Sequence, residues 1–300
     1  MVSARPWIPS AIMRLTLCLV VCLFCGSLVL SVAFHAHAGP KDLRFYRFTA
    51  AAFGSAATAL VFVYRPWTLE TVITRLGAYI LFLYGGFILA FLAHGTGQPP
   101  AASVGQMIVA TLSLQGAALV LIPHFMMEQE LSWNEAFGFH NHPGRALAWG
   151  VIFASLFLPL AMGLQWASAQ IMPHLHLKPA QQESVQTLEM AVSWTHRFGL
   201  GLVTIVIAPV AEEMFFRGIL YPAVKRAGFP RLAFWGTALI FAGVHLNVVT
   251  FIPLVVMALG LALLYERTDN LWAPITAHAL FNALNFVILY STLGPLPQNP

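Results

Sequence analysis

Two adjacent carboxylates and an arginine lie at the end of an apolar stretch long enough to cross a membrane. They are Glu212, Glu213 and Arg217, within residues 208–217, which read APVAEEMFFR. A charged side chain at the centre of a bilayer costs roughly 2.5 to 3.5 kcal/mol, so such residues pair, lie near the surface or line a polar cavity. These residues therefore predict a polar site inside the membrane.

Within this group, Glu213 and Arg217 have the spacing of an ion pair. Residues four apart share a helix face, so the two side chains can neutralise each other. Successive helix residues are about 100° apart, so Glu212 can face a different cavity and keep its own carboxylate. A purely structural salt bridge at a helix end is the alternative.

Two later segments add imidazole and amide groups. Phe241 precedes His245 by four positions, His278 precedes Asn282 by four, and Asn285 follows three further on. Such groups can also join transmembrane helices by hydrogen bonds, so a packing role stays open for each.

Taken together, these residues form an inventory for hydrolysis. A carboxylate and a histidine can position and deprotonate water. A neutral histidine and an asparagine amide can donate to the oxyanion that develops when the water attacks a carbonyl. No serine or cysteine nucleophile is required.

The elements that must position these groups are membrane helices, because 59% of the residues are hydrophobic and only 9% are charged. Apolar stretches of about 20 residues can cross roughly 30 Å of hydrocarbon. The fold predicted is an all-α, polytopic transmembrane helix bundle of about eight or nine spans. The expected spans are 15–34, 49–64, 76–94, 103–125, 146–168, 198–216, 232–249, 251–266 and 272–291.

The remaining sequence features concern orientation and the membrane surface. The net charge of +4 comes from basic residues scattered in short loops. Basic loops orient a membrane protein, so lipid is the expected surrounding and no nucleic-acid partner is expected. Segment 15–34 is expected to be a signal anchor, with a cleaved signal peptide as the alternative. Ser132 and Glu135 have the spacing of a capping box before a short interfacial helix.

Three motifs then carry a resemblance to a known family. Glu212-Glu213-x-x-x-Arg217, Phe241-x-x-x-His245 and His278-x-x-x-Asn282 resemble the motifs of the CAAX-processing and bacteriocin-processing (CPBP) intramembrane endopeptidases. This family is also called the CAAX prenyl protease or abortive infection family. The resemblance is strong over 196–291. It implies a cavity inside the membrane and a protease region over 126–300 with motifs at 212–217, 241–245 and 278–282. The segments before about residue 120 match nothing in the family, and the apolar stretches predict N-terminal transmembrane segments over 1–125.

The resemblance also implies a role for each motif residue. Glu212 and His245 would activate water, and His278 and Asn282 would stabilise the oxyanion. The two remaining motif residues, Glu213 and Arg217, would support them.

Metal dependence is a separate question, because the family has also been described as zinc-dependent. The zinc ligands would then come from Glu212, Glu213, His245 and His278. We favour a mechanism without a cofactor, because asparagine is a poor zinc ligand and nothing in the sequence fixes three ligands at close spacing.

The resemblance leaves the substrate open: a peptide or protein, lipidated or unmodified, in CAAX-type C-terminal processing or in bacteriocin-related processing. The short basic loops and compact length favour a bacterial inner membrane. Buried Glu, Arg and His also mark ion pathways, so a proton-coupled transporter is one alternative. A non-catalytic scaffold that binds a partner peptide is another.

Overall fold

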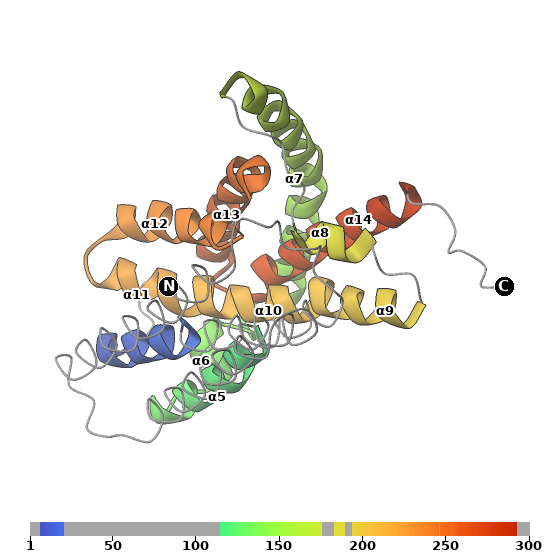
Figure 1. The fold of residues 1–300 in the computed structure, drawn as a ribbon. Coiled ribbons are helices and arrows are strands. Elements are labelled where there is room, and N and C mark those ends of the chain that lie inside the picture. Colours follow the sequence, from blue (N-terminus) through green and yellow to red (C-terminus); the bar gives the residue numbers. More distant parts are fainter. Residues whose placement is uncertain (1–6, 21–114, 176–182, 190–193, 246, 293–300) are drawn as a thin grey trace, which may run out of the picture. The chain divides into compact units, whose positions relative to one another are not determined.

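The structure is a computed structural model that describes residues 7–20, 115–175, 183–189, 194–245 and 247–292. Every regular element in these ranges is a helix (Figure 1), so the all-α prediction is confirmed there. A first helix covers Pro9–Val20. The later elements are α5 (Ala117–Glu128), α6 (Trp133–Phe137), α7 (Pro143–Ile171), η3 (Met172–Leu175), α8 (Glu183–Glu189), α9 (Trp194–Leu202), η4 (Val203–Ile207), α10 (Ala208–Glu213), η5 (Met214–Leu220), α11 (Tyr221–Arg226), α12 (Pro230–Gly243), α13 (Val248–Thr268) and α14 (Trp272–Thr292).

The chain divides into two compact units. One comprises residues 1–8, 102–104 and 122–300, and the other comprises 9–101 and 105–121. All three motifs lie in the first unit, together with every helix from α6 to α14.

Four helices in the described residues are long and apolar enough to cross a membrane, judged by length and composition. They are Pro143–His174, Arg197–Arg226, Val248–Thr268 and Trp272–Thr292. They match four of the expected spans, namely 146–168, 198–216, 251–266 and 272–291. The expected spans before residue 115 lie almost wholly outside the described residues, so the total number of spans stays a prediction.

The predicted span 232–249 is wrong in its extent. Helix α12 has only 14 residues and ends at Gly243. At 1.5 Å per residue it reaches about 21 Å, less than the hydrocarbon thickness. The chain then turns, and the Asn247 side chain caps α13 by accepting a hydrogen bond from the Thr250 backbone N–H at 3.0 Å. The apolar stretch 232–249 therefore contains the boundary between α12 and α13, which its composition does not reveal.

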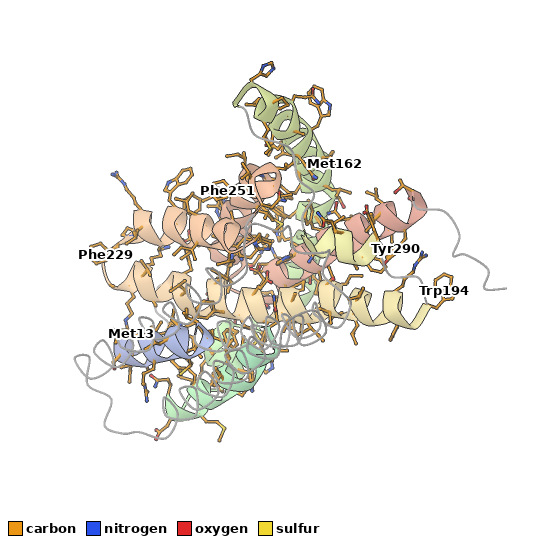
Figure 2. The ribbon with its side chains drawn as sticks, viewed as in Figure 1. Met13, Met162, Trp194, Phe229, Phe251 and Tyr290 are labelled. Carbon is orange, nitrogen blue, oxygen red and sulfur yellow. The ribbon has the colours of Figure 1, made fainter. Side chains whose placement is uncertain are left out.

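Helix α13 is the central helix of the first unit. It packs against α7, α12 and α14, and its side chains are the most buried of the four candidate spans. Large apolar side chains on the other elements point outward instead. Figure 2 shows Met162, Trp194 and Phe229 extending away from the ribbon, and they are 50%, 75% and 59% exposed. This arrangement suits helices surrounded by hydrocarbon.

The helix that carries the first motif is continuous but irregular. From Arg197 to Arg226 it runs as one rod through α9, α10 and α11 in Figure 1. Two π-helical turns, η4 and η5, interrupt its regular hydrogen bonding. Each is followed by a proline near the start of the next α-helical stretch, Pro209 and Pro222. π-helical turns of this kind occur often at functional sites.

The predicted capping box at α6 is confirmed. The Ser132 backbone N–H donates to Glu135 Oε2 at 2.9 Å, and the Glu135 backbone N–H donates to Ser132 Oγ at 3.3 Å. The Ser132 hydroxyl also donates to Glu135 Oε2 at 2.6 Å, and this bond, followed by the one from the Ser132 backbone N–H, lowers the pKa of the Glu135 carboxyl. The helix ends at Gly138, whose φ of 70° is the left-handed conformation that glycine adopts without strain. Its Phe137 is fully buried inside the protein, whereas the sequence predicts an apolar side in the membrane interface.

Helices α7 and α14 pack closely at Gly150, which gives a stability prediction. A Cβ atom at Gly150 would lie 2.7 Å from the Ala273 carbonyl oxygen and 2.8 Å from Thr276 Cβ. We expect Gly150→Ala to reduce the free energy of unfolding by about 1 to 3 kcal/mol, measured by thermal unfolding in detergent. The control is Gly163→Ala in the same helix, where a Cβ meets nothing within 4 Å. Equal melting temperatures for the two variants would contradict the close packing.

Candidate active site

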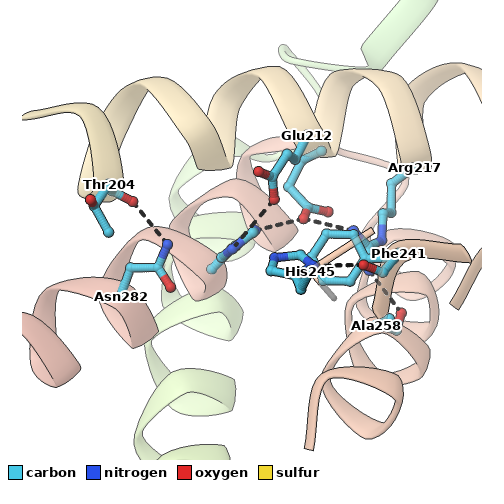
Figure 3. Close-up of polar contacts among 9 residues, drawn as sticks. Thr204, Glu212, Arg217, Phe241, His245, Ala258 and Asn282 are labelled. Carbon is cyan, nitrogen blue, oxygen red and sulfur yellow. Dashed lines mark hydrogen bonds and ion pairs between the residues drawn. The ribbon is translucent and has the colours of Figure 1, made fainter. Parts of the chain in front are cut away.

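Glu213 lies at the centre of a buried polar cluster between α10, η5 and α14. Its side chain is 0% exposed. Its Oε1 atom accepts a hydrogen bond from Arg217 Nη1 at 2.8 Å and lies 2.8 Å from His278 Nδ1 (Figure 3). The predicted i,i+4 ion pair is therefore present, and it has a third partner from a helix 65 residues further on.

Arg217 connects this cluster to two more helices. Its Nη2 atom donates to the Ala258 carbonyl oxygen of α13 at 3.2 Å. Its guanidinium carbon lies 4.5 Å from the centroid of the Phe241 ring of α12, within the range of a cation–π interaction. Only 3% of Arg217 is exposed. A buried guanidinium needs such partners, because removing it from water is costly.

Glu212 approaches the same histidine from the other side. Its Oε2 atom lies 4.0 Å from His278 Nε2, while Glu213 contacts Nδ1. The expectation that the two carboxylates face different cavities is thus wrong. An imidazole has nitrogens on two edges, and α14 brings that ring between the two glutamates.

The hydrogen bonds fix where the protons of His278 lie. Glu213 Oε1 already accepts from Arg217, so it accepts from His278 Nδ1–H as well. In the neutral ring, Nε2 is then an acceptor facing Glu212.

His245 lies in the turn after α12. The sequence predicts it within a helix, as part of the span 232–249. Its backbone N–H donates to Ala242 O, which leaves the Phe241 carbonyl without its usual partner. The His245 Nδ1–H donates to that carbonyl at 2.7 Å. In the neutral ring, Nε2 of His245 is therefore the acceptor. A side chain that caps its own helix end thereby has a fixed tautomer.

The Phe241 ring lies next to both histidines and the arginine. The centroid of its ring lies 5.0 Å from that of His245 and 5.8 Å from that of His278. With the guanidinium over the same ring, Phe241 contacts a residue from each of the three motifs. Sequence reasoning includes Phe241 in a motif but gives it no role.

Asn282 binds the backbone of the first π-helical turn. Its Nδ2 atom donates to the Thr204 carbonyl oxygen at 2.8 Å. That carbonyl lacks a helical donor, because the Ala208 N–H turns to Val203 O and the next residue, Pro209, has no N–H. In the sequence, Pro209 indicates that a carbonyl one turn earlier lacks a helical donor. The sequence does not indicate that Asn282 supplies the hydrogen bond instead. By contrast, Asn285 is exposed and donates to Phe281 O in its own helix.

The arrangement of donors bears on the zinc alternative. Among the described residues, no three His, Cys, Asp or Glu side chains are arranged so that they could hold one metal ion. Oε1 of Glu213 and Nδ1 of each histidine, His245 and His278, already take part in hydrogen bonds within the protein. We therefore derive no step through a metal.

Acidic and imidazole groups that meet among apolar helices define a membrane protein with a buried polar cluster. The comparison with known families makes the class specific. Residues 194–284 match the family described as Type II CAAX prenyl endopeptidase Rce1-like. This match confirms the resemblance drawn from the three motifs over residues 194–284. With four apolar helices among the residues that the structure describes, the chain is an integral membrane protein.

Three bacterial proteins are similar to parts of the chain. The uncharacterized protein YpbD of Bacillus subtilis (strain 168) is 36% identical over 86 residues, 27% of this chain and 41% of that protein. The putative membrane peptidase YdiL of the same strain is 31% identical over 88 residues, 29% of this chain and 35% of YdiL. The UPF0177 protein YaiF of Lactococcus lactis subsp. lactis (strain IL1403) is 24% identical over 160 residues, 50% of this chain and 69% of YaiF.

These similarities are partial. The chain spans well under half the length of YpbD and of YdiL. No solved structure matches it.

The central ion pair gives a second stability prediction. Arg217→Met leaves Glu213 buried without its guanidinium, so we expect the free energy of unfolding to fall by about 3 to 5 kcal/mol. Glu213→Gln in the same chain removes the uncompensated charge, so the double variant should unfold at a higher temperature than Arg217→Met alone. The exposed Arg231→Met is the control, expected within about 0.5 kcal/mol of wild type. A double variant less stable than the single one would contradict this account of the pair.

Proposed function

We propose that this protein is an intramembrane endopeptidase that hydrolyses a peptide bond with a water molecule activated by Glu212 and His245. The observation that carries the proposal is the His278 imidazole between two carboxylates, 2.8 Å from Glu213 and 4.0 Å from Glu212. A structural salt bridge needs only one carboxylate for Arg217. The second carboxylate, next to an imidazole nitrogen, has the components of acid–base chemistry.

The geometry of Glu212 and His245, in the first two motifs, supports their proposed role in activating water. His245 keeps its proton on Nδ1 through the Phe241 carbonyl, so its Nε2 lone pair is available to accept a hydrogen bond from water. A separation of 4.0 Å between Glu212 Oε2 and His278 Nε2 allows one water oxygen within hydrogen-bond distance of both. In the proposed step, the water oxygen attacks the carbonyl carbon and its proton goes to Glu212.

The third motif supplies the proposed oxyanion donors. His278 can donate from Nε2 only as the imidazolium, because Nδ1–H is already engaged with Glu213. The negative charge of Glu213 stabilises that form. Asn282 uses one N–H for the Thr204 carbonyl, and its second amide N–H is left to donate. Breakdown of the tetrahedral intermediate then passes the proton from Glu212 to the leaving amine.

The proposed substrate is a peptide or protein whose scissile bond reaches the membrane. The Rce1-like family is described by its CAAX prenyl endopeptidases, and YdiL is named a putative membrane peptidase. A lipidated C-terminus is accordingly the first substrate class to test, followed by unmodified and bacteriocin-related peptides. The three relatives come from bacteria, which supports a bacterial inner membrane as the location.

The direct test is cleavage of a fluorogenic peptide library, prenylated and unmodified, by the full chain in liposomes. We expect Glu212→Gln to lower the rate at least about 100-fold, because the amide cannot accept the proton from water. The matched control is Glu130→Gln, an exposed carboxylate outside the cluster, which should cleave as wild type does. Unchanged cleavage by Glu212→Gln would refute the proposed base. No cleavage by wild type across the library, together with peptide binding or proton flux, would favour a scaffold or a transporter.

Metal dependence has its own test in the same assay. We expect cleavage to continue at the wild-type rate after dialysis against a strong chelator, because Glu212 and His245 suffice to activate the water. Metal analysis of the dialysed protein by mass spectrometry is the control. Activity that is lost with the metal and restored by zinc would overturn the glutamate mechanism.

A further inference from the structure

Trp7, far from the motifs in sequence, contacts the helix that carries the first motif. It is 3% exposed, and its indole Nε1–H donates to the Gly218 carbonyl oxygen at 3.1 Å across 211 residues of sequence. Its ring centroid lies 5.2 Å from that of Phe125 and 6.3 Å from that of Phe137. The indole is thus fixed by a hydrogen bond and by two neighbouring rings.

The Gly218 carbonyl cannot receive the α-helical hydrogen bond of its own turn. In an α-helix it would accept from residue 222, but that residue is Pro222 and has no N–H. Gly218 is buried within η5, where the Tyr221 N–H reaches back five residues to Phe216 O. A buried carbonyl that loses its partner costs about 1 to 3 kcal/mol. At Thr204 a proline also removes a backbone donor, there five residues further on, and Asn282 supplies a hydrogen bond instead.

A second aromatic side chain, that of Phe137, also restrains this turn. A Cβ atom at Gly218 would lie 2.5 Å from the fully buried Phe137 ring, so ring and backbone are in close contact. The Phe137 carbonyl in turn accepts from the Leu271 N–H at 3.0 Å, just before α14. Trp7 and Phe137 therefore hold the backbone next to Arg217.

We propose that Trp7 is a positioning residue for the active site. Through the Gly218 carbonyl it keeps η5 in its π-helical register, and this register sets where Arg217 meets Glu213. Glu213 in turn orients His278. The predicted effect on cleavage rests on the endopeptidase function proposed above, whereas the hydrogen bond itself is tested independently of activity.

The first variant is Trp7→Phe in the full chain, which keeps an aromatic ring and removes the donor. We expect kcat for the fluorogenic peptide to fall about threefold to tenfold, the worth of one hydrogen bond, with KM unchanged. Rates are measured on the monodisperse fraction well below its unfolding temperature. Trp166→Phe, at a 68% exposed position, is the matched control and should keep the wild-type kcat.

The second variant separates positioning from general packing. Pro222→Ala restores a backbone N–H four residues after Gly218, so the carbonyl gains an alternative donor. In the Pro222→Ala protein we expect Trp7→Phe to change kcat less than twofold. We also expect it to lower the unfolding temperature by less than it does in the wild-type protein. An equal loss in both backgrounds would overturn the proposal, because Trp7 would then act by ring packing only.

Measuring both kcat and the unfolding temperature distinguishes a failure of this proposal from a failure of the proposed function. If wild type cleaves no peptide, the unfolding temperatures of the four proteins still report whether Trp7 and Pro222 are coupled. Coupling without cleavage would count against the endopeptidase and support the contact of Trp7 with Gly218. Cleavage without coupling, in kcat and in unfolding temperature, would refute the role of Trp7 alone.

Discussion

The contact of the Glu213 carboxylate with Arg217 and His278 is the interaction on which the rest of the site depends. A carboxylate that is fully buried needs a cation, and Arg217 provides it at 2.8 Å. The guanidinium then needs further partners of its own, and these come from α12 and α13. Neutralising one charge therefore brings four helical segments together and orients the imidazole that Glu212 faces.

Irregular backbone supplies the other fixed points. The helix from Arg197 to Arg226 contains two π-helical turns, and a proline follows each of them. Carbonyls released in this way are strong acceptors, and their donors are Asn282 at Thr204 and Trp7 at Gly218. Inside a membrane such groups must be satisfied by protein, because hydrocarbon offers no hydrogen bonds. The long helix is thereby tied to α14 and to the N-terminal segment.

The same cluster serves both the fold and the proposed function. Glu213 pairs with Arg217 and lies 2.8 Å from His278 Nδ1, while Glu212 lies 4.0 Å from His278 Nε2. In the proposed mechanism Glu212 is the base and His278 is a donor to the oxyanion. The ion pair that stabilises the fold thus also fixes the ring on which the proposed chemistry depends.

The sequence by itself determined the all-α class, four of the candidate spans, the capping box of α6 and the pairing of Glu213 with Arg217. Those features depend on local periodicity and spacing, which a single chain segment carries. Only the tertiary structure decided that α12 stops at Gly243, that His278 lies between both glutamates, and that Thr204 and Gly218 expose their carbonyls. The partners of His278, Thr204 and Gly218 come from segments 65 to 211 residues away, and no local pattern specifies which distant side chain satisfies a buried polar atom.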